Sequence, residues 1–170
     1  MNDGIGQAIG EARSMLASRA DAGPSPDRPA SAVVENGLRC RVEGADGWTL
    51  VTDMPAAVGG TGSAPTPGWL IRAAWAACAA TSIAMRAAEL GIVLTRLEVK
   101  AESSSDMRGL LGVGKAIDPG PESARLRVRI AAEEPEVERL HELVAWADGH
   151  SPVGDALRRA IPVELEVVTG

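Results

Sequence analysis

Alternation of apolar and polar residues along the chain predicts five β-strands. Residues 38–42 and 48–53 alternate in this way on either side of a Gly-Ala-Asp-Gly turn at 44–47, which is typical of a β-hairpin. Three further segments show similar patterning: 92–102, 124–131 and 163–168.

One long apolar segment has the end signals of a helix. Thr66 can cap it, Pro67 suits its first turn, and Gly91 suits a left-handed residue after its end. The centre of this segment is rich in alanine and apolar on nearly all sides, so it must be surrounded by protein. In a chain of 170 residues this predicts a long central buried helix, cradled by a sheet and by a partner chain.

Shorter helices are expected at 135–148 and 152–160, the second capped by Ser151, while 103–122 has the composition of a loop. The element order is two strands, a long helix, two strands, two helices and a strand. This order predicts the α+β class with a mostly antiparallel sheet.

The first thirty residues differ in character from the rest of the chain. Residues 5–20 are expected to form a short amphipathic helix, and residues 21–30 are rich in proline and small polar side chains, as a linker is. We therefore interpret residues 1–30 as an appendage and residues 31–170 as one domain.

Composition and charge exclude several classes of function. The net charge is −6, and the chain has no Tyr or Phe and only four Trp, which argues against nucleic-acid binding. Two cysteines are too few for a disulfide scaffold. The start lacks the pattern of a signal peptide, and the most apolar run, 73–84, is too short to span a membrane, so we expect a cytoplasmic protein with no membrane partner.

Three motifs are better explained structurally than as sites. Residues 109–116 resemble part of a phosphate-binding loop, but Ala116 stands where Ser or Thr would hold magnesium, and no helix comes after it. His141 and His150 show no metal-ligand spacing with each other or with a cysteine, so no metal or cofactor is expected. The alternating arginines 125, 127 and 129 indicate a solvated sheet face.

Cys78 is the remaining candidate for chemistry. It lies in the middle of the long helix, with Trp75 one turn before it and Ser82 one turn after it. A free cysteine commonly fills a core as a small apolar side chain. A reactive thiol requires a lowered pKa, which a cation or a helix N-terminus supplies. Both interpretations stay open on the residues alone.

The segment from Gly59-Gly60 through Pro65-Thr66-Pro67 to LIRAAWAAC at 70–78, followed by Gly91 and a strand, resembles the OsmC/Ohr family of osmotically induced and organic-hydroperoxide-resistance proteins. The resemblance returns at Ser151-Pro152-Val153. It implies an OsmC-like fold, an intertwined homodimer and a peroxidatic cysteine at Cys78. It also implies a small hydroperoxide substrate and an external thiol or lipoyl reductant.

The sequence departs from the family pattern at three places. Ser151 stands at the position of the second, resolving cysteine and cannot form a disulfide. Gly68 stands where catalytic members have a carboxylate at the start of the helix. The loop at 54–66 contains no arginine, although catalytic members have their activating arginine there.

Arg39, Arg41 and Arg72 are the candidates to replace that arginine, and Cys40 is a weak candidate for the resolving thiol. These residues support two hypotheses. The first is a one-cysteine hydroperoxide reductase that uses Cys78, with an apolar substrate pocket formed by Trp69, Trp75 and Ser82. The alternative is a non-peroxidatic member that binds a small apolar ligand or has a structural stress role.

Overall fold

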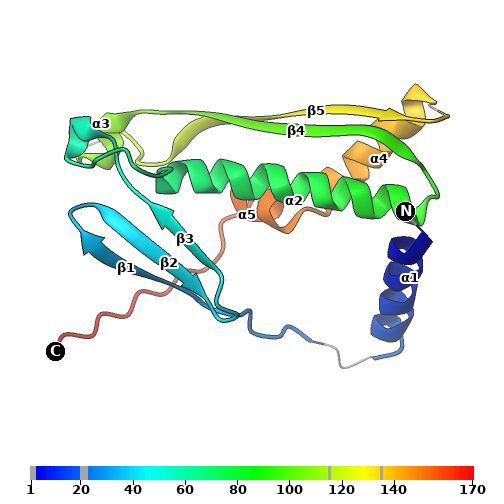
Figure 1. Cartoon of the computed structure of the whole chain (residues 1–170), viewed down its shortest axis with the longest axis horizontal. Coiled ribbons are helices and arrows are strands. Elements are labelled where there is room, and N and C mark those ends of the chain that lie inside the picture. The colour runs from blue at the N-terminus through cyan, green and yellow to red at the C-terminus, as the bar shows by residue number, and fades with distance from the viewer. Residues whose placement is uncertain (1–2, 20–22, 115, 135) are drawn as a thin grey trace. The chain divides into compact units, whose positions relative to one another are not determined.

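The computed structural model describes residues 3–19, 23–114, 116–134 and 136–170 (Figure 1). The elements, in chain order, are α1 (Asp3–Ala17), β1 (Ala30–Asn36), β2 (Arg39–Gly44), β3 (Thr49–Thr52), the 3-10 helix η1 (Ala56–Val58), α2 (Pro67–Glu89), β4 (Leu94–Ser105), α3 (Met107–Leu110), β5 (Pro121–Ala132), α4 (Val137–Gly149) and α5 (Pro152–Arg158). They fall into two compact units, the first of Met1–Ala12 with Ala74–Gly170 and the second of Arg13–Ala73.

The second unit contains a three-stranded antiparallel sheet in the order β1-β2-β3. The predicted hairpin is confirmed as β2 and β3, with Val42 opposite Leu50. Strand β1 was missed by the sequence prediction, and its seven residues are all exposed. Its side chains therefore leave little apolar alternation to detect, and the strand is held by its backbone pairing to β2.

The long helix begins and ends as its end signals predict. The Thr66 hydroxyl accepts a hydrogen bond from the backbone N–H of Trp69 at 3.2 Å, and Pro67 is the first residue of α2. At the other end Gly91 has a φ of 66°, and the N–H of Ile92 donates to the carbonyl of Ala87 at 2.9 Å. These bonds satisfy backbone groups that the helix ends would otherwise leave unpaired.

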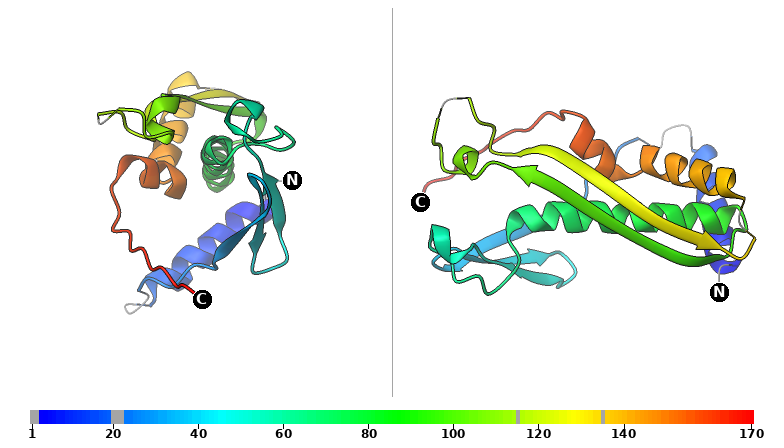
Figure 2. Two further views of the ribbon diagram at one scale, coloured as in Figure 1. Left: turned by 90° about the vertical axis from the view of Figure 1, so that its left-hand side faces the viewer. Right: turned by 90° about the horizontal axis from the view of Figure 1, so that it is seen from above.

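The core of the first unit lies among the second half of α2, the β4–β5 hairpin and α4 (Figure 2). Strands β4 and β5 are antiparallel, with Leu97 opposite Ile130 and Val99 opposite Val128. These four side chains pack against the fully buried part of the core: Ile83, Ala87, Ile92, Ala132, Leu140, Leu143 and Ala147.

The expectation of a loop over 103–122 is wrong at both ends. Strand β4 continues to Ser105, a short helix α3 comes next, and β5 begins at Pro121. Residues 103 and 104 pair with 124 and 123 in register, so cross-strand hydrogen bonds extend the hairpin where side-chain patterning is weak.

The predicted strand at 163–168 is also absent from this single chain. Residues 160–170 have no secondary structure, and Val163, Leu165 and Val168 are 83–89 % exposed. A strand requires a paired edge, and none of the described strands pairs with this segment. The neighbouring helices agree with prediction within two residues, although Pro135, the predicted start of α4, lies outside the described residues.

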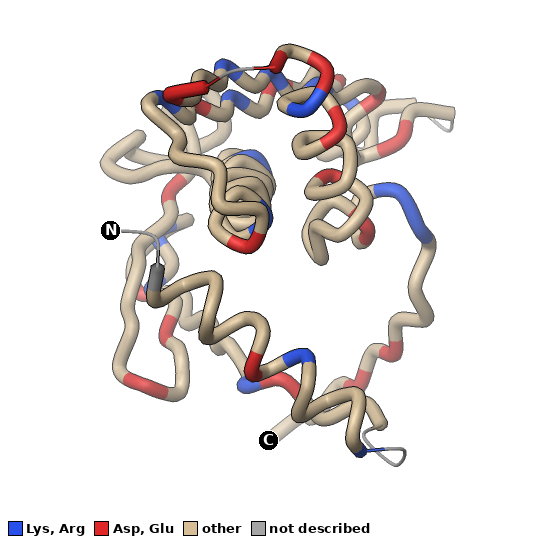
Figure 3. Tube along the Cα trace, turned by 90° about the vertical axis from the view of Figure 1, so that its right-hand side faces the viewer, with Lys and Arg blue, Asp and Glu red and all other residues tan. Residues whose placement is uncertain are grey.

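Helix α2 is covered on one side only. Its buried residues, Trp75, Ala79, Ile83 and Ala87, recur every four positions and form one stripe. Trp69, Ile71 and Met85 are 43–48 % exposed, and Figure 3 shows how few charged residues the helix carries. By length and composition alone α2 could cross a membrane, but core helices of soluble proteins pass the same test, so this single helix is weak evidence.

Helix α1 lies against the end of α2. A Cβ added at Gly6 would stand 2.8 Å from the carbonyl oxygen of Ala88, which is closer than real Cβ contacts, whereas one added at Gly10 would meet nothing within 4 Å. The predicted boundary at residue 30 stays a prediction, but residues 3–12 contact the first unit.

These two glycines give a matched test of that contact. Gly10→Ala is expected to stabilise α1 by about 0.5–1 kcal/mol, because alanine restricts the unfolded chain and favours the helix. Gly6→Ala gains the same propensity but pushes α1 away from Ala88, so amide exchange in residues 3–12 should become faster than in Gly10→Ala. Equal protection in the two variants would contradict the contact.

Candidate functional site

The structure brings Cys78 and Ser151 together across 73 residues of sequence. Cys78 is half-buried in the middle of α2, and Ser151 is 1 % exposed at the start of α5. The Ser151 hydroxyl donates a hydrogen bond to Cys78 Sγ at 3.2 Å and accepts one from the backbone N–H of Gly154, also at 3.2 Å. The site thus consists of a free thiol with a fixed hydroxyl donor.

Local sequence explains why Ser151 is held so firmly. Serine is a favoured N-cap, and Pro152 is suited to the first turn after it. A Cβ at Gly154 would lie 3.1–3.2 Å from Arg158 Nη1 and from Ser151 Cβ and Oγ, so this turn has no room for a side chain. The hydroxyl is therefore fixed in position by the fold of α5.

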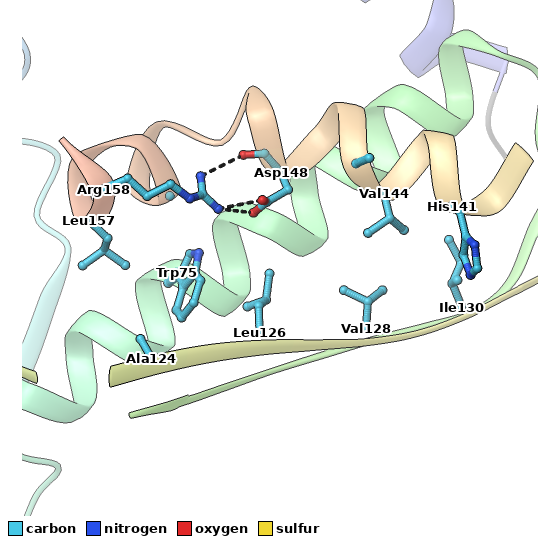
Figure 4. Close-up of a pocket in the computed structure, with 12 residues that line it drawn as sticks. Trp75, Ala124, Leu126, Val128, Ile130, His141, Val144, Asp148, Leu157 and Arg158 are labelled. Atoms are coloured by element: carbon cyan, nitrogen blue, oxygen red, sulfur yellow. Dashed lines mark hydrogen bonds and ion pairs between the residues drawn. The ribbon is translucent and has the colours of Figure 1, made fainter. Parts of the chain in front are cut away.

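A cavity of about 650 Å³ borders this pair in the first unit. Figure 4 shows it enclosed by α2, β5, α4 and α5. Its apolar lining is formed by Ala124, Leu126, Val128, Ile130, Val144, Ala145 and Leu157. Polar residues lie toward its rim, where Arg158 Nη2 donates to both carboxylate oxygens of Asp148 at 2.6 Å.

Trp75 forms the part of the cavity wall nearest to the thiol in sequence. It is 8 % exposed, and its Nε1 is buried with no hydrogen-bond acceptor among the described residues. Gly154, whose N–H binds Ser151, lines the same cavity. The cavity and the Cys78–Ser151 pair therefore share two neighbouring residues.

The other residues of the predicted substrate pocket lie elsewhere. Trp69 lines a hollow of about 410 Å³ in the second unit, together with Arg72 and the loop before α2. Ser82 is half-buried one turn beyond Cys78. The structure thus places Trp75, but neither of these two, in the wall of the larger cavity.

The three candidate activators all belong to the second unit, as does Cys40 on β2. Arg39 donates to Ser63 Oγ at 2.9 Å, and Arg41 pairs with Glu35 at 2.7 Å and with Glu43. Arg72 lines the hollow beside Trp69. Each is described only with neighbours of its own unit, so their approach to Cys78 stays a prediction.

Asp53 is a buried residue whose importance the sequence analysis missed. It is 1 % exposed at the end of β3, where its Oδ1 accepts from the N–H of Met54 and its Oδ2 accepts from the N–H and hydroxyl groups of both Thr61 and Ser63. These bonds, that of the Thr61 hydroxyl above all, hold the pKa of Asp53 well below its ordinary value of 3.8. An aspartate before a loop rich in glycine, serine and threonine was the available signal.

The segments set aside as structural have ordinary neighbours. His150 stacks on Trp146 with ring centroids 3.9 Å apart, and the Arg86 guanidinium lies 4.4 Å from the same indole. On the hairpin, Arg127 pairs with Glu102 and Arg129 with Glu98. The residues that resemble a phosphate-binding loop include α3, and their lysine, Lys115, lies outside the described residues. Within the described parts of the chain no three His, Cys, Asp or Glu residues cluster as metal ligands.

Fold and site together define an α+β protein with a thiol presented from a central helix beside an apolar cavity. The family of OsmC-like proteins matches residues 60–166, so the chain belongs to this family. A search among curated protein sequences gave no match.

Solved structures of the same fold support this assignment. An organic hydroperoxide resistance protein from Legionella pneumophila is 25 % identical, with a TM-score of 0.58, over 80 % of this chain and 92 % of that one. A putative organic hydroperoxide resistance protein from Vibrio cholerae, with captopril in one of its active sites, is also 25 % identical, with a TM-score of 0.54, over 81 % and 88 %. An OsmC-like protein from Mycoplasma pneumoniae shows the fold alone, with 15 % identity and a TM-score of 0.65 over 79 % and 89 %.

Proposed function

We propose that this protein is a thiol-dependent hydroperoxide reductase that uses one cysteine, Cys78. The observation that carries the proposal is the 3.2 Å contact between the Ser151 hydroxyl and Cys78 Sγ beside an apolar cavity. Relatives of the same family are named for resistance to organic hydroperoxides.

In the first step the Cys78 thiolate attacks the outer oxygen of an alkyl hydroperoxide. An S–O bond forms and the O–O bond breaks, which leaves a sulfenic acid on Cys78 and an alkoxide that takes up a proton to become an alcohol. The sulfur is oxidised, and the peroxide is reduced by the same two electrons.

Ser151 determines how the sulfenic acid is reduced. Its hydroxyl can donate to the sulfur, a bond that is stronger when the sulfur carries negative charge. It cannot condense with the sulfenic acid as a second thiol would. An external dithiol therefore completes the cycle. One of its thiols displaces water to form a mixed disulfide, and its second thiol breaks that disulfide, releasing Cys78 and the oxidised reductant.

We also infer that the protein acts as a homodimer. Two features favour a partner chain: the uncovered apolar side of α2, with Trp69, Ile71 and Met85 exposed, and the unpaired apolar alternation at 163–168. A second copy that covers this side of α2 would bring its own charged residues near the helix. The cation that the loop at 54–66 lacks would then come from Arg39, Arg41 or Arg72 of either copy.

Cysteine variants test the proposed reaction. The wild-type protein and Cys40→Ser should consume cumene hydroperoxide in the presence of dihydrolipoamide, while Cys78→Ser should fall to the rate without protein. Dimedone should label Cys78 after one equivalent of hydroperoxide. Equal rates in wild type and Cys78→Ser would refute the proposal, and binding of cumyl alcohol without any turnover would support the ligand-binding alternative instead.

A further inference from the structure

The indole N–H of Trp75 is a buried polar group that the proposed reaction does not use. A buried donor without an acceptor costs free energy, and for this reason native proteins rarely keep one. Trp75 is 8 % exposed, and its Nε1 has no acceptor among the described residues. Figure 4 shows this indole projecting from α2 into the cavity.

The rest of the cavity indicates what kind of molecule would supply the acceptor. Its volume of about 650 Å³ is ordinary for a small-molecule site, and its β5 wall consists of Ala124, Leu126, Val128 and Ile130. Asp148 already takes both hydrogen bonds of Arg158 Nη2, so the charge at the rim is compensated within the chain. The site therefore suits an uncharged, mainly apolar molecule better than an anion.

We propose that Trp75 Nε1 donates a hydrogen bond to an oxygen atom of an uncharged organic molecule held in this cavity. Trp75 lies three residues before Cys78, on the same side of α2. Gly154 joins the cavity to the Ser151 hydroxyl that contacts Cys78. A molecule anchored at Trp75 thus has its oxygen end on the side of the thiol and its apolar part along β5.

This role makes Trp75 a positioning residue for alkyl hydroperoxides, and in that respect it rests on the proposed function. The hydrogen bond would distinguish molecules with an oxygen acceptor from hydrocarbons of the same shape. It would also favour neutral hydroperoxides and their alcohol products over carboxylates, because the compensated Arg158 offers no free charge.

Binding can be tested without any turnover. Cumyl alcohol and cumene share one carbon skeleton and differ by a hydroxyl group, and the four tryptophan indole N–H signals can be resolved by nuclear magnetic resonance and assigned with single Trp→Phe variants. Cumyl alcohol should shift the Trp75 indole proton downfield, while cumene should shift it little. Trp75→Phe should bind cumyl alcohol about two- to tenfold more weakly, as expected for the loss of one neutral hydrogen bond.

Trp48→Phe is the matched control, because Trp48 is 77 % exposed and makes the same chemical change outside the cavity. It should bind both probes as the wild type does. With cumene hydroperoxide, Trp75→Phe should raise KM by a similar factor and leave kcat within about twofold. An unmoved Trp75 signal, or equal shifts with alcohol and hydrocarbon, would overturn the inference. A shifted signal in a protein without hydroperoxide turnover would leave it standing and refute only the proposed reaction.

Discussion

Ser151→Cys is expected to convert the site into a two-thiol centre that closes a disulfide with Cys78 when one equivalent of alkyl hydroperoxide is added. The serine oxygen lies 3.2 Å from Cys78 Sγ, so a sulfur at the same position needs only a small approach to reach bonding distance. The sulfenic acid on Cys78 would condense with the new thiol and release water. The disulfide would link two segments 73 residues apart and should stabilise the fold by about 2–4 kcal/mol.

Thiol titration and mass spectrometry of the unfolded protein measure this outcome. Peroxide should remove both thiols of the site in Ser151→Cys and leave Cys40 titratable. Ser82→Cys is the control, because residues four apart on a helix hold their Cβ atoms about 5–6 Å apart, beyond the span of an unstrained disulfide. If Ser151→Cys kept both thiols after peroxide, either the contact or the sulfenic acid would be excluded.

Local signals were sufficient to predict the elements that carry the site. Thr66, Pro67 and Gly91 fix the ends of α2 by capping and backbone geometry, and Ser151-Pro152 does the same for α5. Such signals act within a few residues, so a single sequence reveals them. The meeting of Cys78 with Ser151 has no local signal, and it was anticipated only through the family resemblance.

Other features depend on contacts that no short window contains. The segment at 163–168 has the alternation of a strand but finds no pairing edge among the described strands of the single chain. The cavity is lined from β5, α4 and α5 as well as by Trp75, so its existence follows from packing rather than from any motif. The importance of Asp53 depends on hydrogen bonds to residues eight and ten positions later.

Asp53→Asn is expected to loosen the loop between β3 and α2, which leads into the Thr66 cap. One carboxylate oxygen accepts the Met54 N–H while the other accepts donors from Thr61 and Ser63. An asparagine has one acceptor oxygen, and its NH₂ group must face backbone N–H groups on the other side. A Cβ at Gly60 would lie 1.8 Å from the Met54 carbonyl oxygen, so this tightly folded loop cannot simply rearrange around the change. Limited proteolysis within residues 54–66 should become about tenfold faster at neutral pH.

The pH dependence separates the carboxylate from a general loss of packing. Hydrogen bonds lower the folded-state pKa of Asp53, so its contribution to stability is complete above the ordinary value of 3.8 and declines as the pH falls below it. The difference in stability between wild type and Asp53→Asn should therefore be constant from about pH 7 to about pH 5 and shrink in stronger acid. Asp46→Asn, an exposed partner of Arg28, should match the wild type in proteolysis and in this profile. A difference that stays constant below about pH 3 would show that Asp53 acts through its shape alone, since protonation of the wild-type carboxyl would then cost the loop nothing.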